Sequence, residues 1–183
     1  MISAGQGTRL IKSLVRKKLV IVHKINLGGQ GGSTKFLELT KNAYKVLGIG
    51  PKTGIGRGAG FEHTYWQYHH SEKIKMIPDV QRVATEEMVM NKCIDILVET
   101  KTEKIAVEIA MTPDHEKDNI EKDVEAGCSK IFIGCKDKSV LGIVKKIAES
   151  FSDEIRAKIT VCLVQKVISE VENYLNQQGS ENG

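Results

Sequence analysis

Near the middle of the chain, two short apolar runs are separated by a polar turn. The runs cover residues 93–98 and 104–110, and the polar residues 100–103 lie between them. This pattern predicts a β-hairpin. Each predicted strand contains one acid, Asp95 in the first and Glu108 in the second. A carboxylate among apolar residues needs a cation or hydrogen-bond donors, so two acids on paired strands favour a site for a hard divalent cation such as magnesium.

From residue 61 to the C-terminus, the pattern alternates between helices and strands. Helical spacing and helix-start signals predict helices over 61–74, 114–126 and 140–151 and from residue 168 onward. Short apolar runs predict further strands within 75–85 and over 130–134 and 159–164. Thr112 and Pro113 are expected to cap and start the helix that follows the hairpin. This order predicts an α/β fold with a mixed sheet, in which a crossover helix leads to a strand parallel to the one that carries Glu108.

The first 47 residues predict a separate and smaller α+β piece. Its pattern contains a helix, a strand, a glycine-rich tip, a second strand and a short helix, over residues 4–19, 19–27, 28–33, 35–39 and 40–47. Thr40 is expected to cap the short helix. Six glycines in residues 48–60 indicate a linker. The second domain is therefore expected to span residues 61–177, and a polar tail follows at 178–183.

The positive charge of the chain is concentrated at its N-terminal end. Residues 1–60 contain eleven Lys or Arg residues and one acid, Glu38, for a net charge of +10. Because the whole chain carries +4, the remainder carries −6. Such asymmetry predicts that the basic part binds a polyanion, here DNA, although a solvated basic face is the alternative. The candidate DNA-binding residues are Arg9, Lys12, Arg16, Lys24 and Lys35.

Several classes of protein are disfavoured by features that the sequence lacks. No apolar run reaches about 18 residues, which predicts that no segment spans a membrane. The N-terminus has no apolar signal core, so we expect a cytoplasmic location. The four cysteines stand singly and favour reduced, buried thiols over zinc ligands: Cys93, Cys128, Cys135 and Cys162. Nucleophile-elbow, His-Glu-x-x-His, P-loop and dinucleotide-binding motifs are not found.

Asp95 lies on the first predicted strand, and Glu108 lies on the second strand, after the hairpin turn. This arrangement resembles the core of the PD-(D/E)xK nuclease superfamily. The resemblance implies a restriction-endonuclease-like αβββαβ core and metal-assisted hydrolysis of DNA. It also implies that Asp95 and Glu108 bind Mg²⁺ or Mn²⁺. Glu62, on the helix that begins the second domain, is the candidate for a further metal ligand by the same resemblance. Asp79, which follows Pro78, is a less favoured alternative to Asp95 because a residue after proline suits a turn or an edge.

The superfamily places a catalytic lysine two residues after the glutamate, and Ala110 occupies that position here. Some members supply this cation from the following helix instead. That helix offers Lys117 and Lys122, and we rank Lys117 first because it lies nearer the end of the strand that carries Glu108. Lys117 is therefore the candidate catalytic lysine.

Residues 35–48, Lys-Phe-Leu-Glu-Leu-Thr-Lys-Asn-Ala-Tyr-Lys-Val-Leu-Gly, resemble the wing and following helix of winged-helix DNA-binding domains. The resemblance implies that residues 1–47 are a partial winged-helix module that binds DNA. A complete module has further helices before this point. We therefore expect either that the chain is the C-terminal part of a longer protein or that a partner completes the module, and a homodimer is one form of such a partner.

Two alternatives to a nuclease are kept open. In the first, Asp95 and Glu108 are partners of a lysine or of backbone amides in a nuclease fold that no longer cuts DNA. In the second, the chain is a regulatory or assembly domain of a motor, replication, transfer or mobile-element protein. Its acidic part would then bind protein, and the basic part would bind DNA weakly and without sequence preference.

Overall fold

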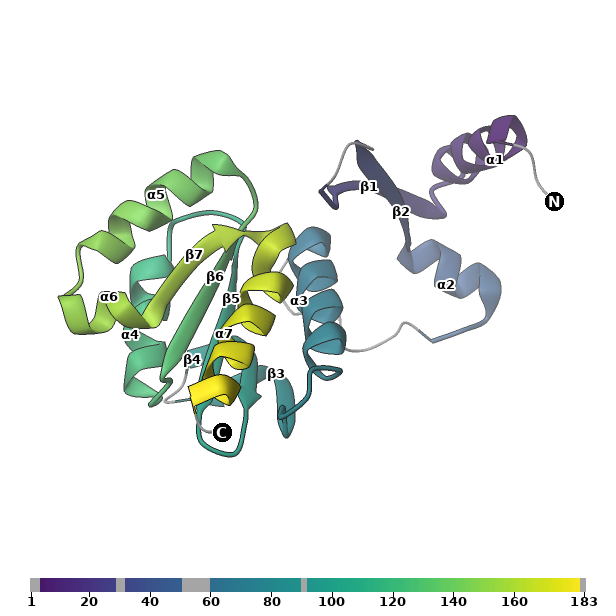
Figure 1. Ribbon diagram of the computed structural model, residues 1–183. Helices are drawn as coiled ribbons and strands as arrows, with labels where there is room; N and C mark the ends of the chain where they lie inside the picture. Colours follow the sequence, from purple (N-terminus) through teal and green to yellow (C-terminus); the bar gives the residue numbers. More distant parts are fainter. Residues whose placement is uncertain (1–3, 29–31, 51–59, 90–91, 182–183) are drawn as a thin grey trace. The chain divides into compact units, whose positions relative to one another are not determined.

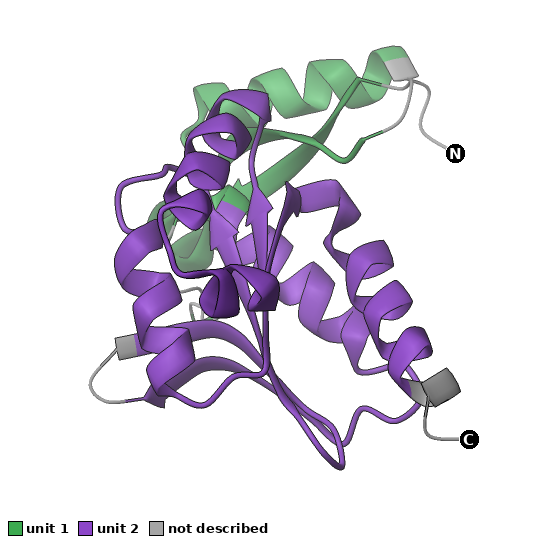
Figure 2. Cartoon of the chain, turned by 60° about the vertical axis from the view of Figure 1, so that its left-hand side comes forward, with its two compact units in different colours: residues 1–62 green, residues 63–183 purple. Residues whose placement is uncertain are grey.

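The computed structural model describes residues 4–28, 32–50, 60–89 and 92–181 of the chain. These residues form two compact units, 1–62 and 63–183, which Figure 2 shows in different colours. Most of the predicted linker, residues 51–59, lies outside the described residues, as do residues 29–31 of the predicted glycine-rich tip.

The N-terminal unit is a small α+β arrangement built on one antiparallel strand pair (Figure 1). Its elements are α1 (Ala4–Arg16), β1 (Val20–Asn26), β2 (Ser33–Leu39) and α2 (Lys41–Leu47). The two strands pair from Val20 opposite Leu39 to Asn26 opposite Ser33. Thr40 caps α2, as predicted, because its hydroxyl accepts the backbone N–H of Ala43 at 3.2 Å.

Helix α1 is shorter than the sequence pattern predicts. It ends at Arg16 rather than at residue 19, and Lys18 has a φ of 55°. This left-handed conformation turns the chain out of the helix, and β1 begins two residues later. Leu19, the last apolar residue of the predicted helix, therefore lies in the turn before β1.

The C-terminal unit is a mixed α/β fold with a five-stranded sheet. Its elements are α3 (Phe61–Ile74, which starts at the unit boundary), β3 (Arg82–Val89), β4 (Lys92–Glu99), β5 (Lys104–Ala110), α4 (Glu116–Glu125), β6 (Lys130–Cys135), α5 (Lys138–Glu149), α6 (Asp153–Lys158), β7 (Ile159–Leu163) and α7 (Val167–Glu181). The strand order is β3-β4-β5-β6-β7. The first three strands are antiparallel, and β5, β6 and β7 are parallel. The predicted mixed α/β class with a strand parallel to β5 is thus confirmed.

The predicted hairpin is present with a defined register. Strands β4 and β5 pair from Glu99 opposite Lys104 to Ile96 opposite Val107. The turn between them is closed because the Thr100 hydroxyl accepts the backbone N–H of Glu103 at 3.1 Å. Asp95 of β4 and Glu108 of β5 lie immediately beyond the last pair of residues, one on each strand.

Helices cover both faces of the sheet in the C-terminal unit. Figure 1 shows α4 and α5 on one face and α3 and α7 on the other. The face under α4 and α5 carries a buried apolar cluster that includes Ile120, Ile131, Ile133 and Val144. Both faces of the parallel strands are therefore buried. This burial explains why the sequence of β6 is a nearly continuous apolar run.

Several predicted element boundaries are wrong. The strand expected within residues 75–85 runs from Arg82 to Val89, and Asp79 lies in the preceding turn with a φ of 71°. The crossover helix begins at Glu116 after His115, whose side chain makes no cap hydrogen bond, so Thr112 is not its cap. Helix α6 was not predicted. The last helix continues to Glu181, so much of the predicted polar tail is helical.

Candidate functional site

The candidate site lies where β4 and β5 stop pairing. Beyond the last pair, Ile96 and Val107, the next residues are Asp95 and Glu108. The backbone N–H of Ile109 donates to Asp95 Oδ2 at 2.8 Å. A side-chain carboxylate thus accepts a strand N–H at this point, so Asp95 bridges the two strands at the open end of the hairpin.

Asp95 is also fixed from helix α3. His63 Nε2 lies 3.0 Å from Asp95 Oδ2, and Gln67 Nε2 donates to the Asp95 backbone carbonyl at 2.9 Å. Burial lowers the pKa of His63, but the hydrogen bond and charge of Asp95, with the charges of Glu86 and Glu116, outweigh burial and raise the pKa above 6.5. The imidazole is therefore held beside a carboxylate that stabilises its protonated form.

Glu108 forms a buried ion pair with a lysine from α4. Lys122 Nζ donates to Glu108 Oε1 at 2.8 Å and to the Cys93 carbonyl of β4 at 2.6 Å, and it lies 3.4 Å from Asp123 Oδ1. The side chains of Lys122 and Glu108 are only 2% and 3% exposed. Lys122 makes two hydrogen bonds and one further ion pair with the buried carboxylate of Asp123. Lys122 thus links the two strands of the hairpin on the side of α4.

The pKa values of this pair reflect burial opposed by charge. Burial, together with the charges of Asp123 and Asp95, raises the pKa of Glu108 well above its usual value, although Lys122 opposes this shift. Burial lowers the pKa of Lys122, but Glu108 and Asp123 outweigh burial and raise it. The lysine therefore stays protonated at neutral pH.

Two further acids of α4 are buried beside this pair. Glu116 is 4% exposed, and its Oε2 atom is buried without a hydrogen-bond partner. Burial and then the charge of Asp95 raise the pKa of Glu116 to about 7. Asp123 is fully buried, and burial raises the pKa of its carboxyl group. Four carboxyl groups thus share this region with one lysine and one histidine, and a bound cation would stabilise the ionised forms of these carboxyl groups.

The structure brings together some of the predicted site residues and not others. Asp95 and Glu108 lie at the same end of the hairpin, as predicted. Lys122, the lower-ranked lysine, pairs with Glu108, whereas Lys117 is exposed on α4. Glu62 lies in the first turn of α3 but belongs to the N-terminal unit, so the site described here is built without it.

Sequence reasoning did not assign four residues of this site: His63, Gln67, Glu116 and Asp123. His63 and Gln67 are four residues apart and share one face of α3, which was the available signal. Glu116 and Asp123 carry no comparable signal, because acids on a helix are seldom buried. The structure buries both of them, and no sequence pattern distinguishes them from solvated acids.

The carboxylates of this site are the type of ligand that suits a hard divalent cation. Carboxylate oxygens are the ligands that Mg²⁺ prefers, and Glu116 Oε2 is a buried carboxylate oxygen without a hydrogen-bond partner. Within the part of the chain that the structure describes, no three His, Cys, Asp or Glu side chains already converge on one metal position. The described cysteines are free thiols.

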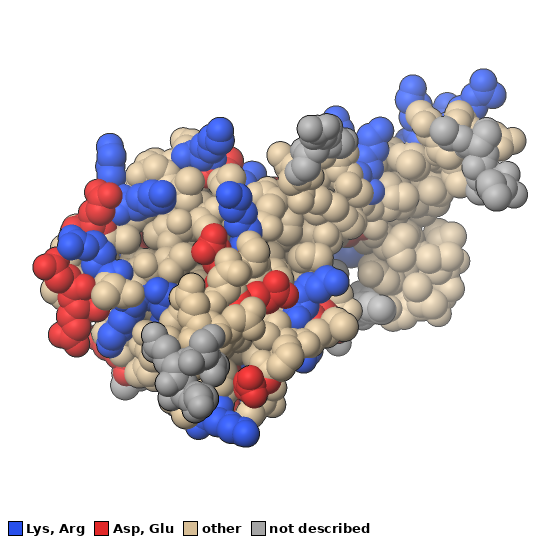
Figure 3. Space-filling view, viewed as in Figure 1, with Lys and Arg blue, Asp and Glu red and all other residues tan. Residues whose placement is uncertain are grey.

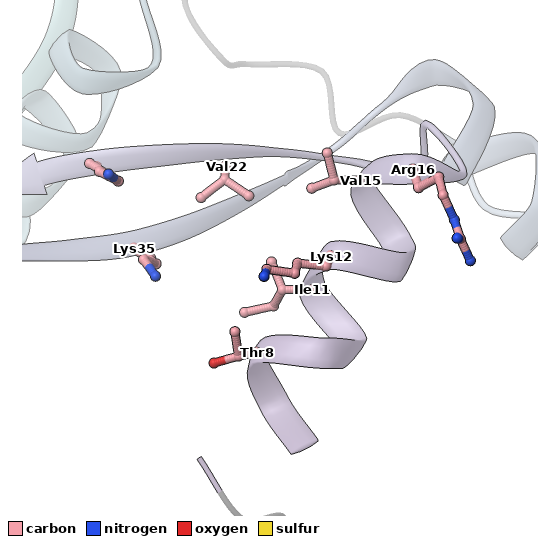
Figure 4. Close-up of a pocket in the computed structure, with 8 residues that line it drawn as sticks. Thr8, Ile11, Lys12, Val15, Arg16, Val22 and Lys35 are labelled. Carbon is pink, nitrogen blue, oxygen red and sulfur yellow. The ribbon is translucent and has the colours of Figure 1, made fainter. Parts of the chain in front are cut away.

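A second feature, in the N-terminal unit, is a groove between α1 and the β1–β2 hairpin. Its volume is about 400 Å³, and it is lined by Thr8, Ile11, Lys12, Val15, Arg16, Val22, Lys24 and Lys35. Figure 4 shows Ile11, Lys12 and Val15 directed toward the hairpin. Four of the five predicted DNA-binding residues line this groove, and Arg9 lies elsewhere on α1.

Charge is distributed differently over the two units. Figure 3 shows Lys and Arg side chains along the visible face of the N-terminal unit, and basic and acidic side chains intermingled on the C-terminal unit. Glu38, the acid of the first 60 residues, lies 2.7 Å from His23 Nε2. The groove residues are therefore cationic or uncharged, which suits a polyanion.

No protein-family model and no curated protein matches this chain. Among the described residues, no helix is both long enough and apolar enough to cross a membrane. The geometry and chemistry of the two sites are therefore the basis for a functional assignment.

Proposed function

We propose that this protein is a metal-dependent DNA nuclease. Its reactive site is the open end of the β4–β5 hairpin, and its N-terminal unit contacts the DNA backbone. The observation that carries this proposal is the placement of Asp95, Glu108 and Lys122 at one end of one hairpin, with Lys122 Nζ 2.8 Å from Glu108.

The order of elements supports the resemblance to the PD-(D/E)xK superfamily. The chain runs α3, β3, β4, β5, α4, β6, the same order as the αβββαβ core that the resemblance implies. The lysine of the superfamily motif is replaced by Ala110 in the sequence. Lys122 of α4 reaches the carboxylate that such a lysine would serve, so we assign the lysine role to Lys122 rather than to Lys117.

In this proposal Asp95 and Glu108 hold Mg²⁺ or Mn²⁺, and Glu116 supplies a nearby carboxylate. When bound, the cation lowers the pKa of a water molecule and neutralises charge on the phosphate oxygens. Lys122 stays protonated, so it orients Glu108 and adds positive charge rather than accepting a proton. Burial of the pair strengthens this electrostatic effect, because the local dielectric constant is lower than in water.

The N-terminal unit supplies the affinity for DNA in the same proposal. Lys12, Lys24 and Lys35 surround the groove between α1 and the hairpin, with Arg16 at its edge. Contacts between such cations and phosphates hold DNA without reading its sequence. The resemblance of residues 35–48 to a winged-helix wing supports this role for the unit.

A second candidate function is a DNA-binding or assembly module whose nuclease fold does not cut. Two observations favour it. Asp95 and Glu108 already have protein partners, namely the Ile109 amide with His63 and the Lys122 ammonium group. In the described residues, no preassembled set of three metal ligands is present either. Such a module would act within a larger replication, transfer or mobile-element assembly.

Incubation of the full chain with supercoiled plasmid and Mg²⁺ or Mn²⁺ separates the two functions. We expect metal-dependent nicking that Asp95→Asn and Glu108→Gln abolish. Asp118→Asn is the matched control, because it removes a charge from an exposed position of α4. Thermal melts show that each variant is folded. DNA binding without cleavage by the wild type would instead establish the second function.

The two lysines of α4 are distinguished in the same assay. Lys117→Ala should cleave like the wild type, because its side chain is exposed. Loss of cleavage in Lys117→Ala, with a normal melting temperature, would return the lysine role to Lys117 and contradict the assignment of Lys122.

A further inference from the structure

Two polar side chains of α3 lie one turn apart and reach the same residue of β4. His63 Nε2 is 3.0 Å from Asp95 Oδ2, and Gln67 Nε2 donates to the Asp95 carbonyl at 2.9 Å. Gln67 is 5% exposed, and the His63 side chain is 16% exposed. Helix α3 therefore fixes both the side chain and the backbone of the candidate metal ligand.

The two hydrogen bonds to the Asp95 carboxylate determine which way its two oxygens point. The imidazole of His63 and the backbone N–H of Ile109 both contact Oδ2 of Asp95, at 3.0 Å and 2.8 Å. Two partners on one oxygen fix the rotation of the carboxylate and leave Oδ1 as the oxygen for a cation. A ligand held in its binding orientation loses less conformational entropy when the cation arrives.

Packing alone does not account for these side chains. Burial of an amide or imidazole group costs free energy unless hydrogen bonds compensate for it, and an apolar residue would fill the same space at less cost. His70, on the same helix, shows the contrasting case. It is 1% exposed and stacks on Trp66, and burial, with the charge of His69, lowers its pKa to about 3, so it is an uncharged packing residue.

We propose that His63 and Gln67 are positioning residues that hold Asp95 with Oδ1 presented to a divalent cation. This inference rests on the proposed function. Outer hydrogen-bond partners of metal ligands are known to change metal affinity by about 10- to 100-fold when they are removed. Neither residue needs to touch the cation or the DNA for this effect.

The test combines calorimetric titration of the full chain with Mn²⁺ and cleavage assays over a range of Mn²⁺ concentrations. His63→Ala and Gln67→Met remove the donors, and His63→Gln restores an amide that can donate to Oδ2. His69→Ala is the matched control, a half-buried histidine of α3 that stacks on Tyr65. Thermal melts identify any variant that is not folded.

We expect His63→Ala and Gln67→Met to weaken Mn²⁺ binding about tenfold and to raise the Mn²⁺ concentration for half-maximal cleavage by the same factor. The cleavage rate at saturating Mn²⁺ should change little, because the bound cation itself then holds the Asp95 carboxylate in its binding orientation. His63→Gln should recover most of the affinity, and His69→Ala should match the wild type. A general loss of structure would not produce this separation between affinity and maximal rate.

The outcomes separate this inference from the proposed function. Wild-type protein that binds Mn²⁺ and cleaves DNA, together with unchanged Mn²⁺ affinity in folded His63→Ala and Gln67→Met, would overturn the positioning role alone. Wild-type protein that neither binds Mn²⁺ nor cleaves DNA would overturn both proposals. Equal loss of affinity in His63→Ala and His63→Gln would assign the effect to the imidazole itself and overturn the hydrogen-bond role.

Discussion

Buried ionisable groups dominate the chemistry of this protein at the scale of single residues. Lys122, Glu108 and Asp123 share one buried network, and Glu116 lies beside it with an oxygen that has no partner. Burial raises the pKa values of Glu108, Glu116 and Asp123 because it disfavours their charged forms. Such groups decrease the stability of the fold when they ionise, and clusters of perturbed pKa values are typical of functional sites.

Glu116→Gln should stabilise the protein at alkaline pH. The folded-state pKa of about 7 exceeds the ordinary 4.5, so the folded protein binds this proton more tightly than the unfolded chain does. The wild type therefore loses stability as the pH rises from 4.5 through 7, whereas the glutamine variant does not. We expect a gain on the order of 1–3 kcal/mol at pH 8 and little change at pH 5, measured by urea unfolding. The same gain at both pH values would contradict this prediction.

Lys122→Met should be strongly destabilising, because it leaves Glu108 and Asp123 buried without their cation. Removal of one partner from a buried ion pair costs about 3–5 kcal/mol. Methionine keeps most of the volume of the lysine side chain, so the decrease in the free energy of unfolding is due to the lost charge rather than to a cavity. Urea unfolding at neutral pH measures it, and Lys117→Met on the exposed side of α4 is the matched control. Equal stability of the two variants would show that the buried pair contributes nothing.

At the scale of elements, the parallel part of the sheet depends on close packing between β6 and the start of α7. Gly134 of β6 faces this contact. A Cβ atom at this position would lie 2.6 Å from Val167 Cγ2 and 3.3 Å from Val164 Cα. Real Cβ atoms do not approach other atoms so closely, so glycine is required here by space rather than by backbone conformation.

Gly134→Ala should destabilise the C-terminal unit by about 1–3 kcal/mol, because overpacking forces α7 away from the sheet. Val167→Ala removes the nearest atom and should recover part of this loss in the double variant. Thermal or urea unfolding of the two single variants and the double variant measures the coupling. Strictly additive effects would show that the contact with Val167 is not the source of the strain.

Helix α5 depends on its N-terminal cap. Asp137 accepts the backbone N–H groups of Ser139 at 2.9 Å and Val140 at 3.0 Å through one carboxylate oxygen. Asp137→Ala should cost about 1 kcal/mol, and Asp137→Ser should retain most of the stability. Urea unfolding measures the difference. Similar losses in both variants would assign the effect to something other than capping.

At the scale of the whole molecule, charge is divided between two units. The basic first 60 residues belong to the N-terminal unit, which has a cationic groove, and the remaining residues carry net negative charge and the candidate site at the β4–β5 hairpin. In the proposed function, this division assigns affinity for DNA to the N-terminal unit and chemistry to the C-terminal unit. Salt dependence of binding then reports on the N-terminal unit.

The triple variant Lys12→Gln, Lys24→Gln, Lys35→Gln should bind duplex DNA more weakly and with less dependence on salt. Each phosphate contact contributes about 0.9 to the slope of log K against log salt, so the slope should fall by about 2–3. Fluorescence anisotropy between 50 and 200 mM salt, roughly the range over which such contacts are screened, measures it.

The matched control for this triple variant removes three exposed lysines of the C-terminal unit, Lys117, Lys145 and Lys146. It makes the same change in net charge at different positions. The control should bind DNA with a slope near that of the wild type. Equal slopes in the two triple variants would show that DNA is attracted by total charge and not held in the groove.

The hairpin was predictable because its information is local. Runs of apolar residues and a polar turn predict strands over 93–98 and 104–110, and the structure has them at Lys92–Glu99 and Lys104–Ala110. Thr40 was predictable as a cap for the same reason. The start of α4 was not, because Thr112 and Pro113 supply a local signal that the chain does not use.

By itself, the sequence determined the mixed α/β class, the hairpin, the two acids at its open end and the concentration of positive charge in the first 60 residues. These properties follow from residue order and spacing over a few positions. Tertiary structure alone decided that Lys122 rather than Lys117 pairs with Glu108, and that His63 and Gln67 fix Asp95. It also decided that Glu116 and Asp123 are buried. The physical reason is that these contacts join α3, β4, β5 and α4, and how far a side chain reaches across a sheet depends on how the helices pack on it, which local spacing does not encode.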